Sequence, residues 1–313
     1  MAAERVLITG VTGFVGSHMA DYVLAMGAEF QLYGLRRWHH SRMRNVQHML
    51  DAINWVDCDL TDPIAVRNVI DQVRPDKIFH FAAESFVSPS WQHPTHYMNA
   101  NYQGTVNILD ALHQFRLSTR ILIPGSGEEY GKIEESELPI TEQTILRPVN
   151  PYAVSKIAQD LIGYVYNQSF GTNVIRTRAF NHEGPRRDKV FGIPWYAFQI
   201  ARIEAGFKPN VVRVGHLDDL RNFTHVQDIV RAYWLAMEKC KPGEMYLIGS
   251  ESLDHLHTFK EALERLIEMS NVRGISYEED PELVRPTNVP RLIGDVSKFR
   301  DLTGWDPEIP FQQ

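Results

Sequence analysis

Short apolar runs alternate with longer helical patterns through the first half of this 313-residue chain. The runs Val6–Ile8 and Ile121–Ile123 are apolar without a polar face, as expected for strands that are covered on both sides. Helical patterns follow such runs, and this rhythm is typical of right-handed βαβ units in a doubly wound parallel sheet. The elements predicted from it are Arg5–Thr9, Ser17–Met26, Phe30–Leu35, Ile53–Val56, Pro63–Val73, Lys77–Ala82, Asn99–Phe115, Arg120–Pro124, Pro151–Phe170 and Val174–Arg178.

The alternation ends after about Arg178, where residues 179–224 become rich in Asn, Pro, Arg and Gly. A helix at Val226–Glu238 and a strand at Met245–Ile248 are predicted to return to the main sheet, and a capped helix is predicted at Thr258–Met269. The sequence therefore predicts an α/β chain with a Rossmann-type domain, residues 1–178 with 225–250. Residues 179–224 and 251–313 are predicted to form a smaller C-terminal substrate-binding lobe.

A glycine-rich turn, Gly10-Val11-Thr12-Gly13-Phe14-Val15-Gly16, lies directly after the first predicted strand and before a helix. In this context backbone amides and the helix N-terminus can hold a pyrophosphate. Its spacing is GxxGxxG, and a plain tight turn is the alternative. The turn predicts cofactor contacts from Gly10, Thr12, Gly13, Phe14, Val15 and Gly16.

The second predicted strand ends in Arg36-Arg37, where no acid is present to bind a ribose hydroxyl. Arginine suits a 2′-phosphate, so the sequence favours NADP over NAD. The alternative is a solvated basic turn that also includes Arg42 and Arg44. Later strand ends predict further cofactor contacts from Asp59, Leu60, Ala82, Ala83 and Ser85, although each could be ordinary loop packing.

Tyr152 and Lys156 are four residues apart on a predicted helix and therefore share one face. A neighbouring ammonium is expected to lower the pKa of the phenol, while Ser126, after the fifth strand, can hydrogen-bond a substrate oxygen. Glu128 adds a carboxylate that simple ketone reduction does not need, and it could remove a proton alpha to a carbonyl. The alternative for Glu128 is a solvated loop acid.

Four arginines follow in the predicted smaller lobe, and their guanidinium groups match phosphate oxygens. Each could instead be a surface ion-pair partner. These residues are Arg186, Arg187, Arg221 and Arg285. They predict a polyphosphate-linked substrate.

The net charge of −7 and the pI near 6.0 argue against nucleic acid or an anionic membrane as the main partner. No apolar run is long enough to cross a bilayer. Cys58 and Cys240 match no metal spacing, nor do the histidines, so no metal site is predicted. A reduced, cytoplasmic protein is expected.

Several motifs resemble the extended short-chain dehydrogenase/reductase family, within its nucleotide-sugar dehydratase and reductase branch. The similarity is closest to the GDP-mannose 4,6-dehydratases and spans nearly the whole chain. The motifs that carry it are Phe180-Asn181-His182-Glu183-Gly184-Pro185-Arg186-Arg187, Gly215-His216-Leu217-Asp218, Arg285-Pro286-Thr287, and Leu292-Ile293-Gly294-Asp295 followed by Gly304-Trp305.

The resemblance implies catalytic roles for Ser126, Glu128, Tyr152 and Lys156, and cofactor contacts from Tyr152, Lys156, His182, Arg187 and Arg36. It implies that the substrate, a GDP-sugar, is bound by Ser85, Ser126, Glu128, Asn181, Arg187, Arg221 and Arg285. It also implies a homodimer or homotetramer. The expected reaction is 4,6-dehydration with bound NADP; a GDP-4-keto-6-deoxymannose reductase, a nucleotide-sugar epimerase and a non-catalytic NADP sensor are the alternatives.

The sequence departs from the dehydratase pattern at three positions. Gly127 replaces a residue with a side-chain hydroxyl or carboxylate, Gly184 replaces a serine, and Asn288 stands where an acid usually follows Arg-Pro-Thr. The first departure removes the group that would protonate the departing C6 hydroxyl.

Overall fold

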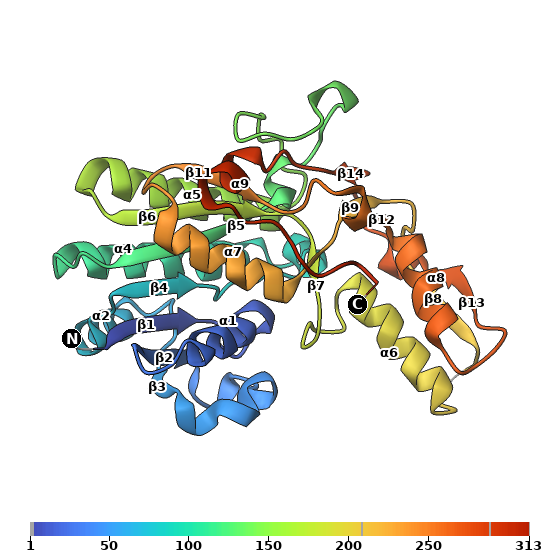
Figure 1. Cartoon of the computed structure of the whole chain (residues 1–313), viewed down its shortest axis with the longest axis horizontal. Coiled ribbons are helices and arrows are strands. Elements are labelled where there is room, and N and C mark those ends of the chain that lie inside the picture. The colour runs from blue at the N-terminus through green and yellow to red at the C-terminus, as the bar shows by residue number, and fades with distance from the viewer. Residues whose placement is uncertain (1–2, 208, 288, 313) are drawn as a thin grey trace.

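The main body of the computed structural model, which describes residues 3–207, 209–287 and 289–312, is a parallel sheet of seven strands (Figure 1). The strand order is β11-β6-β5-β4-β1-β2-β3, with every neighbouring pair parallel. The strands are β1 (Glu4–Thr9), β2 (Phe30–Arg36), β3 (Asn54–Asp57), β4 (Lys77–His80), β5 (Arg120–Ser126), β6 (Asn173–Ala179) and β11 (Met245–Ile248). The predicted doubly wound parallel sheet is confirmed.

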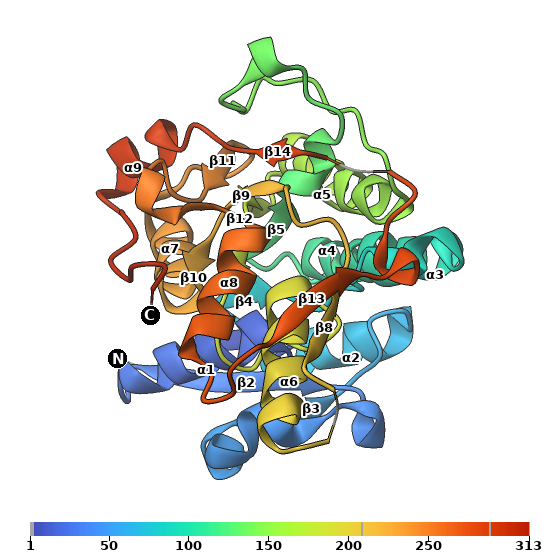
Figure 2. The same cartoon turned by 90° about the vertical axis from the view of Figure 1, so that its right-hand side faces the viewer.

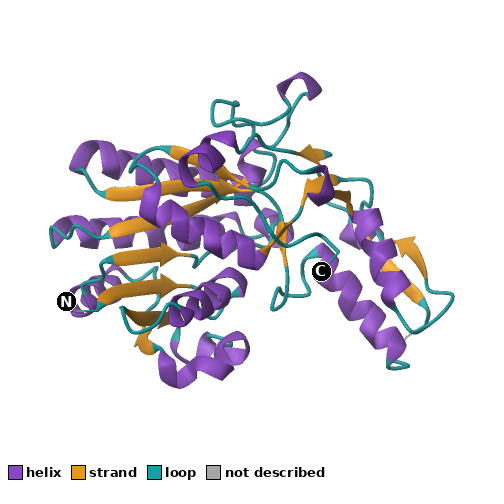
Figure 3. Cartoon of the chain, in the orientation of Figure 1, coloured by secondary structure: helices purple, strands orange, loops and turns teal. Residues whose placement is uncertain are grey.

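Helices cover both faces of this sheet (Figure 3). One face carries α1 (Phe14–Ala25), α7 (Val226–Lys239) and α9 (Ser297–Thr303), and the other carries α2 (Pro63–Val73), α4 (Gly104–Gln114) and α5 (Pro151–Phe170). Alternate residues of β1 enter the two layers: Val6 and Ile8 pack toward α1 and α7, and Leu7 packs toward α2 and α4. This is the side-chain period of two that a strand requires.

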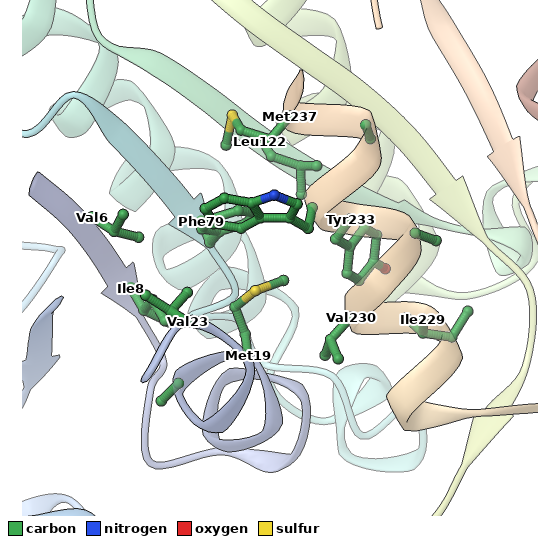
Figure 4. Packing of buried hydrophobic residues seen from close by; sticks show 14 of the residues in the cluster. Val6, Ile8, Met19, Val23, Phe79, Leu122, Ile229, Val230, Tyr233 and Met237 are labelled. Carbon is green, nitrogen blue, oxygen red and sulfur yellow. The ribbon is translucent and has the colours of Figure 1, made fainter. Parts of the chain in front are cut away.

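Aromatic rings form the centre of the layer between the sheet and α7 (Figure 4). Phe79 of β4 is fully buried and stacks on Trp234 of α7, with ring centroids 5.7 Å apart. Tyr233, also on α7, lies nearby with Met19 of α1 in the same cluster. Large rings bury much apolar area, so the stack of Phe79 on Trp234 helps to hold α7 against the sheet.

A smaller lobe lies beyond the carboxyl ends of the strands (Figures 1 and 2). It contains α6 (Gly192–Glu204), α8 (Phe259–Met269), β8 (Val211–Val214) and β13 (Ser276–Glu279), with its own apolar cluster built around Ile200, Val212 and Leu263. Helix α8 begins as predicted, because Thr258 and Glu261 form a reciprocal capping box.

Short strands connect the lobe to the main body. β9 (Leu220–Asn222) lies between β12 (Leu256–Thr258) and β14 (Arg291–Leu292), and β7 (His182–Glu183) pairs with β10 (Thr224–His225). These pairings tie the residues after β6 to the segment that leads into α7.

The tail differs from its predicted place. Residues 251–313 were assigned to the smaller lobe, but α9 packs against α7 and β11. Phe299 and Trp305 are 0% and 1% exposed within the main core, and the Trp305 indole donates to Asp228 O at 3.1 Å. Burial of two large rings therefore places this part of the tail on the sheet.

The helix predicted at Asn99–Phe115 is also more irregular than expected. It begins as α3 (Pro94–Tyr97), widens into a π-helical segment at Met98–Gln103, and continues as α4. The wide turn brings the Asn101 side chain to the Glu84 backbone, whose N–H donates to Asn101 Oδ1 at 2.8 Å. Such π segments are common near functional sites. A 3₁₀ segment, Met43–Ala52, and shorter 3₁₀ turns complete the connections. Asn288, one of the three sequence departures, lies outside the described residues.

In the part of the chain that the structure describes, none of the helices combines the length and the apolar character that crossing a bilayer requires.

Replacing Phe79 with alanine is expected to lower the free energy of unfolding by about 3–5 kcal/mol, because it removes a fully buried ring that the core cannot refill. Chemical denaturation monitored by circular dichroism measures this loss. Ile64→Ala on α2 is the control, because Ile64 is 66% exposed. A loss for Phe79→Ala no larger than that of the control would contradict the core that Figure 4 displays.

Candidate active site

A cavity of about 940 Å³ lies at the carboxyl ends of the strands, and Gly192, Phe259 and Arg285 of the smaller lobe also line it. Ligands bind at this edge in doubly wound sheets. The predicted site residues that line it are Gly10, Thr12, Gly13, Phe14, Val15, Gly16, Arg36, Arg37, Asp59, Leu60, Ala82, Ala83, Ser85, Ser126, Glu128, Tyr152, Lys156, Asn181, His182, Arg187 and Arg285. The fold thus brings nearly all of them to one place.

The glycine turn between β1 and α1 is packed so tightly that side chains are excluded. A Cβ on Gly10, whose φ is +66°, would lie 2.6 Å from the Ala82 N, and a Cβ on Gly16 would lie 2.2 Å from the Gly10 O. Gly13 is the N-cap of α1 and has no side chain to occupy the first amides of the helix. A ligand can therefore approach the backbone amides at the N-terminus of α1, which fits the pyrophosphate of a dinucleotide.

Basic side chains lie at the end of the cavity next to β2. Arg36 donates through Nε to Asp57 at 2.8 Å and lies over the Trp55 ring, so its position is fixed by neighbours. Arg37 lines the cavity together with Ser41 and Arg42. These hydrogen-bond donors fit a phosphate on the adenosine ribose. The sequence did not predict a role for Ser41, and it placed Arg42 only in the alternative, a solvated basic turn.

Helix α5 places Tyr152 and Lys156 against the end of β5. Its start is set by Asn150, whose side-chain oxygen accepts the Ala153 N–H at 2.8 Å, with Pro151 in the first turn. The Ser126 side chain lies near the Tyr152 hydroxyl and lowers the pKa of this phenol. The Lys156 Nζ donates to Pro124 O at 2.6 Å and also to the Gln159 side chain. Phenol, ammonium and serine hydroxyl therefore converge on one wall of the cavity.

Burial dominates the electrostatics of this pair. It raises the pKa of Tyr152 above its ordinary value, and the Ser126 side chain opposes the change. Burial also lowers the pKa of Lys156 to about 8, against the raising effect of Glu129 and Asp160. The expected lowering of the phenol pKa by Lys156 is not found, because burial of Tyr152 dominates and the cation that lowers its pKa is Arg187.

Glu128 is held at the cavity wall by two groups that sequence reasoning did not connect to it. Asn150 donates through Nδ2 to Glu128 Oε2 at 3.2 Å, and the Arg285 Nη1 lies 3.7 Å from Glu128 Oε1. Asn150 therefore both caps α5 and orients the carboxylate. An Asn directly before a Pro at a helix start is a capping signal in sequence, but its second contact depends on the fold.

A second group of charges lies on the other wall. Arg187 donates a hydrogen bond to His182 O and forms an ion pair with Glu183 at 3.4 Å. Its guanidinium also lies over the Phe191 ring, with 4.2 Å between Cζ and the ring centroid. Burial raises the pKa of Glu183 to about 7, while Arg187 lowers it. Glu183 lines the cavity and was not among the predicted residues.

Two of the predicted phosphate-binding arginines do not line the cavity. Arg221 is only 4% exposed, and its Nη1 donates to Leu220 O at 3.0 Å and Pro290 O at 3.3 Å. Arg186 pairs with Asp21 at 2.6 Å. Arg221 thus lies behind the wall that carries Glu128 and Arg285, where it acts on both electrostatically.

The fold and the site together define an enzyme of the extended short-chain dehydrogenase/reductase class. A family model, GDP-mannose 4,6 dehydratase, matches residues 7–313. The chain therefore belongs to this family, and the predicted resemblance is confirmed.

Relatives within the class catalyse more than one reaction. The chain is 31% identical to GDP-6-deoxy-D-mannose reductase of Pseudomonas aeruginosa over 310 residues, 99% of this chain and 94% of the relative. It is 29% identical to a GDP-mannose 4,6-dehydratase of Vibrio cholerae over 344 residues, 99% of this chain and 91% of the relative. These relatives support a nucleotide-sugar dehydratase or reductase.

Solved structures agree with the fold. The structure of RMD from Pseudomonas aeruginosa complexed with NADPH is 30% identical in sequence and has a TM-score of 0.84. The match covers 99% of this chain and 96% of that chain. The structure of Thermus thermophilus UDP-glucose 4-epimerase in complex with NAD is 28% identical and has a TM-score of 0.83. The match covers 98% of this chain and 95% of that chain.

Replacing Arg37 with alanine is expected to weaken NADP binding about tenfold, equivalent to about 1.4 kcal/mol, because a cation facing the ribose phosphate is lost. The affinity for NAD, which lacks that phosphate, should stay the same. Isothermal titration calorimetry measures both. Arg74→Ala is the control, since Arg74 pairs with Asp71 at the surface. Equal losses for NADP and NAD would contradict the assignment of Arg37.

Proposed function

We propose that the chain is an NADP-dependent nucleotide-sugar 4,6-dehydratase that acts on GDP-mannose or a related GDP-sugar. The observation that carries this proposal is the carboxylate of Glu128 on the same cavity wall as Ser126 and Tyr152. Reduction or epimerisation at C4 needs no such base, whereas elimination of water requires removal of a carbon-bound proton. The family model and the dehydratase relatives support the same reaction.

In this proposal the residues of the chain act in a defined order. NADP, when bound, supplies a hydride acceptor for the C4 carbon and a hydride donor for C6. Tyr152, in its ionised form, would take the C4 hydroxyl proton while Ser126 donates a hydrogen bond to the same oxygen. The positive charge of Lys156 would favour this phenolate form. Glu128 then removes the C5 proton, and the C6 hydroxyl leaves as water with the proton that Tyr152 took from the C4 hydroxyl. Glu128 finally returns its proton to C5 as C6 is reduced. Asn150 and Arg285 keep Glu128 aimed at the sugar.

Other residues would hold the two ligands. The glycine turn and α1 would bind the cofactor pyrophosphate, with Arg37 at the 2′-phosphate and His182 near the cofactor. Asn181, Arg187, Arg285 and Ser85 would hold the sugar nucleotide, and the buried Arg221 would add positive charge to this side of the site. Fixing the sugar through its nucleotide orients the reacting carbon, an effect that reaches roughly 7–11 kcal/mol in favourable cases. The homodimer or homotetramer remains a prediction.

The second candidate is a 4-keto reductase that consumes NADPH. Gly127 favours it, because a residue beside Glu128 that could protonate the leaving hydroxyl is replaced by hydrogen. A Cβ there would lie 3.0 Å from the Phe180 ring, so the packing leaves little room for such a side chain. The reductase of Pseudomonas aeruginosa, 31% identical, supports the same alternative.

One assay decides between the candidates. Purified protein is incubated with GDP-mannose and NADP while absorbance at 340 nm and product mass are followed. A loss of about 18 mass units without net NADPH change supports dehydration. Turnover that begins only with a 4-keto-6-deoxy sugar nucleotide and NADPH overturns dehydration in favour of reduction, and conversion without a mass change indicates an epimerase.

Replacing Tyr152 with phenylalanine is expected to lower kcat by roughly 10²–10⁴-fold, because the group that transfers the C4 proton is lost. NADP binding should persist. Tyr164→Phe on the outer face of the same helix is the control, since Tyr164 is 42% exposed. Wild-type turnover in the Tyr152 variant would disprove the role of the phenol.

Replacing Glu128 with glutamine tests the base directly. The amide can still bond to Asn150 but cannot take a carbon-bound proton, so dehydration should fall by roughly 10²–10⁴-fold. Turnover with GDP-mannose, measured as product mass against time, is the readout. Glu134→Gln, on the exposed loop that follows the site, is the control. Undiminished dehydration by the Glu128 variant would refute the proposed base.

A further inference from the structure

Glu129 is a buried acid beside the site for which the proposed chemistry has no use. It lies in the 3₁₀ turn Gly127–Tyr130 that follows β5 and is 0% exposed. Its Oε1 accepts the Ser126 N–H at 2.8 Å, and its Oε2 accepts from Arg178 Nε at 2.6 Å. Because both oxygens accept hydrogen bonds, the contacts match the ionised form, although burial raises the pKa of this carboxyl.

The backbone around Glu129 is shaped to admit its carboxylate. A Cβ on Gly125, the residue before Ser126, would lie 2.4 Å from Glu129 Oε1. The carboxylate therefore reaches the Ser126 amide only because residue 125 has no side chain. The same turn is closed from the other side by the Ser126 hydroxyl, which accepts the Glu128 N–H at 3.2 Å. Glu129 and Ser126 thus restrain each other.

Glu129 also belongs to a buried group of charges that includes Lys156. Asp160 accepts from Arg176 and Arg178, and Arg178 bridges Asp160 to Glu129. Three cations, Lys156, Arg176 and Arg178, therefore face two carboxylates. Removing the charge of Glu129 would leave three cations with one carboxylate, which disfavours the protonated form of Lys156.

The groups that face Lys156 come from three elements. Glu129 faces it from the turn after β5, and Asp160 from its own helix; both raise the pKa of Lys156. His80 of β4 is fully buried between Thr9 and Thr105, and burial lowers its pKa to about 3, so it is neutral. Burial raises the pKa of Tyr152, also on α5, which disfavours a resting negative charge on its phenol. Glu129 and Asp160 are thus the negative charges in this environment.

We propose that Glu129 is a positioning residue of this active site, which holds the Ser126 loop in place and supplies negative charge to the environment of Lys156. The inference rests on the proposed roles of Ser126 and Lys156, but its first test does not require turnover. Glu129 is not among the residues that line the cavity, so it acts through Ser126 and Lys156.

Two substitutions separate the two parts of this role. Glu129→Gln retains an oxygen that can accept from Ser126 but removes the charge. Glu129→Asp retains the charge but is one methylene shorter, so it loses the Ser126 contact. Glu137→Gln is the control, because Glu137 forms its ion pair with Arg147 at the surface of the following loop.

The first measurement is the titration of Lys156 by NMR in protein labelled with [13Cε]lysine, with the signal assigned from its absence in Lys156→Met. The Glu129→Gln variant should titrate at a pH lower by on the order of one unit. The Glu129→Asp and Glu137→Gln variants should titrate as the wild type does. An unchanged Lys156 titration in folded Glu129→Gln would overturn the electrostatic part of the proposal.

The second measurement is the pH dependence of kcat and KM with the substrate that the wild type accepts. Because the ammonium form is the active one, Glu129→Gln should lose activity at a lower alkaline pH than the wild type. Glu129→Asp should lower kcat roughly tenfold with KM unchanged, because Ser126 is displaced from its productive position. A wild-type kcat for Glu129→Asp would overturn the positioning part of the proposal. This test stands even if the Glu129→Gln variant fails to fold.

Failure of the proposed function gives a different result. A wild type that converts neither GDP-mannose nor a 4-keto-6-deoxy sugar nucleotide would refute the proposed reactions. The Lys156 titration would still decide whether Glu129 supplies its charge.

Discussion

The geometry of the active site depends on the guanidinium of Arg178. This group joins the turn after β5 to α5, the two elements that carry the reactive groups. From β6 it donates to Glu129, in the turn that follows β5, at 2.6 Å, and to Asp160, on α5, at 2.7 Å. Both pairs are buried, and such charges are costly unless their hydrogen bonds are complete. Arg176 supplies the remaining bonds to Asp160. A shift of α5 along the sheet would leave buried charges unpaired, so the distance between Ser126 and Tyr152 is restricted by electrostatics as well as by apolar packing.

Local charge explains how an acidic chain can bind a polyanionic ligand. The net charge is −7, yet the cations that line the cavity beside the N-terminus of α1 outnumber the acids there. The cations are Arg36, Arg37, Arg42, Lys156, Arg187 and Arg285, and the acids are Asp59, Glu84, Glu128 and Glu183. Low-dielectric walls strengthen these interactions relative to those of the exposed acids, which water and salt screen. For ligand binding, the local charge around the cavity therefore matters more than the net charge of the chain. Phe14 and Phe191 add flat apolar surface beneath Arg187, which keeps its guanidinium extended along the wall.

Much of the fold could be predicted where a local signal coincides with a tertiary role. The bounds of α2, α5 and β11 agree with the predicted ranges, because proline starts or apolar runs mark them. The glycine turn was predictable from its place between a strand and a helix, and Gly16 is required by a contact within the turn. Gly10 is required by the remote backbone of Ala82, which the sequence does not show. Prediction was less successful where partners are remote. The π-helical turn at Met98–Gln103, the packing of α9 on the sheet and the burial of Arg221 each depend on residues far away in the chain.

By itself the sequence determined the kind of sheet, the place of the dinucleotide turn and the identity of the groups that can carry proton transfer, because apolar periodicity and short motifs act over a few residues. Only the tertiary structure decided which charged groups meet. Glu128 and Glu129 are adjacent and chemically identical, yet one faces the cavity with Asn150 and Arg285, and the other is buried against Arg178. Their different surroundings follow from the turn after β5 and from β6 and α5 beside it. Burial and partner geometry are properties of the assembled chain, so they, rather than residue type, separate a proposed base from a proposed positioning residue.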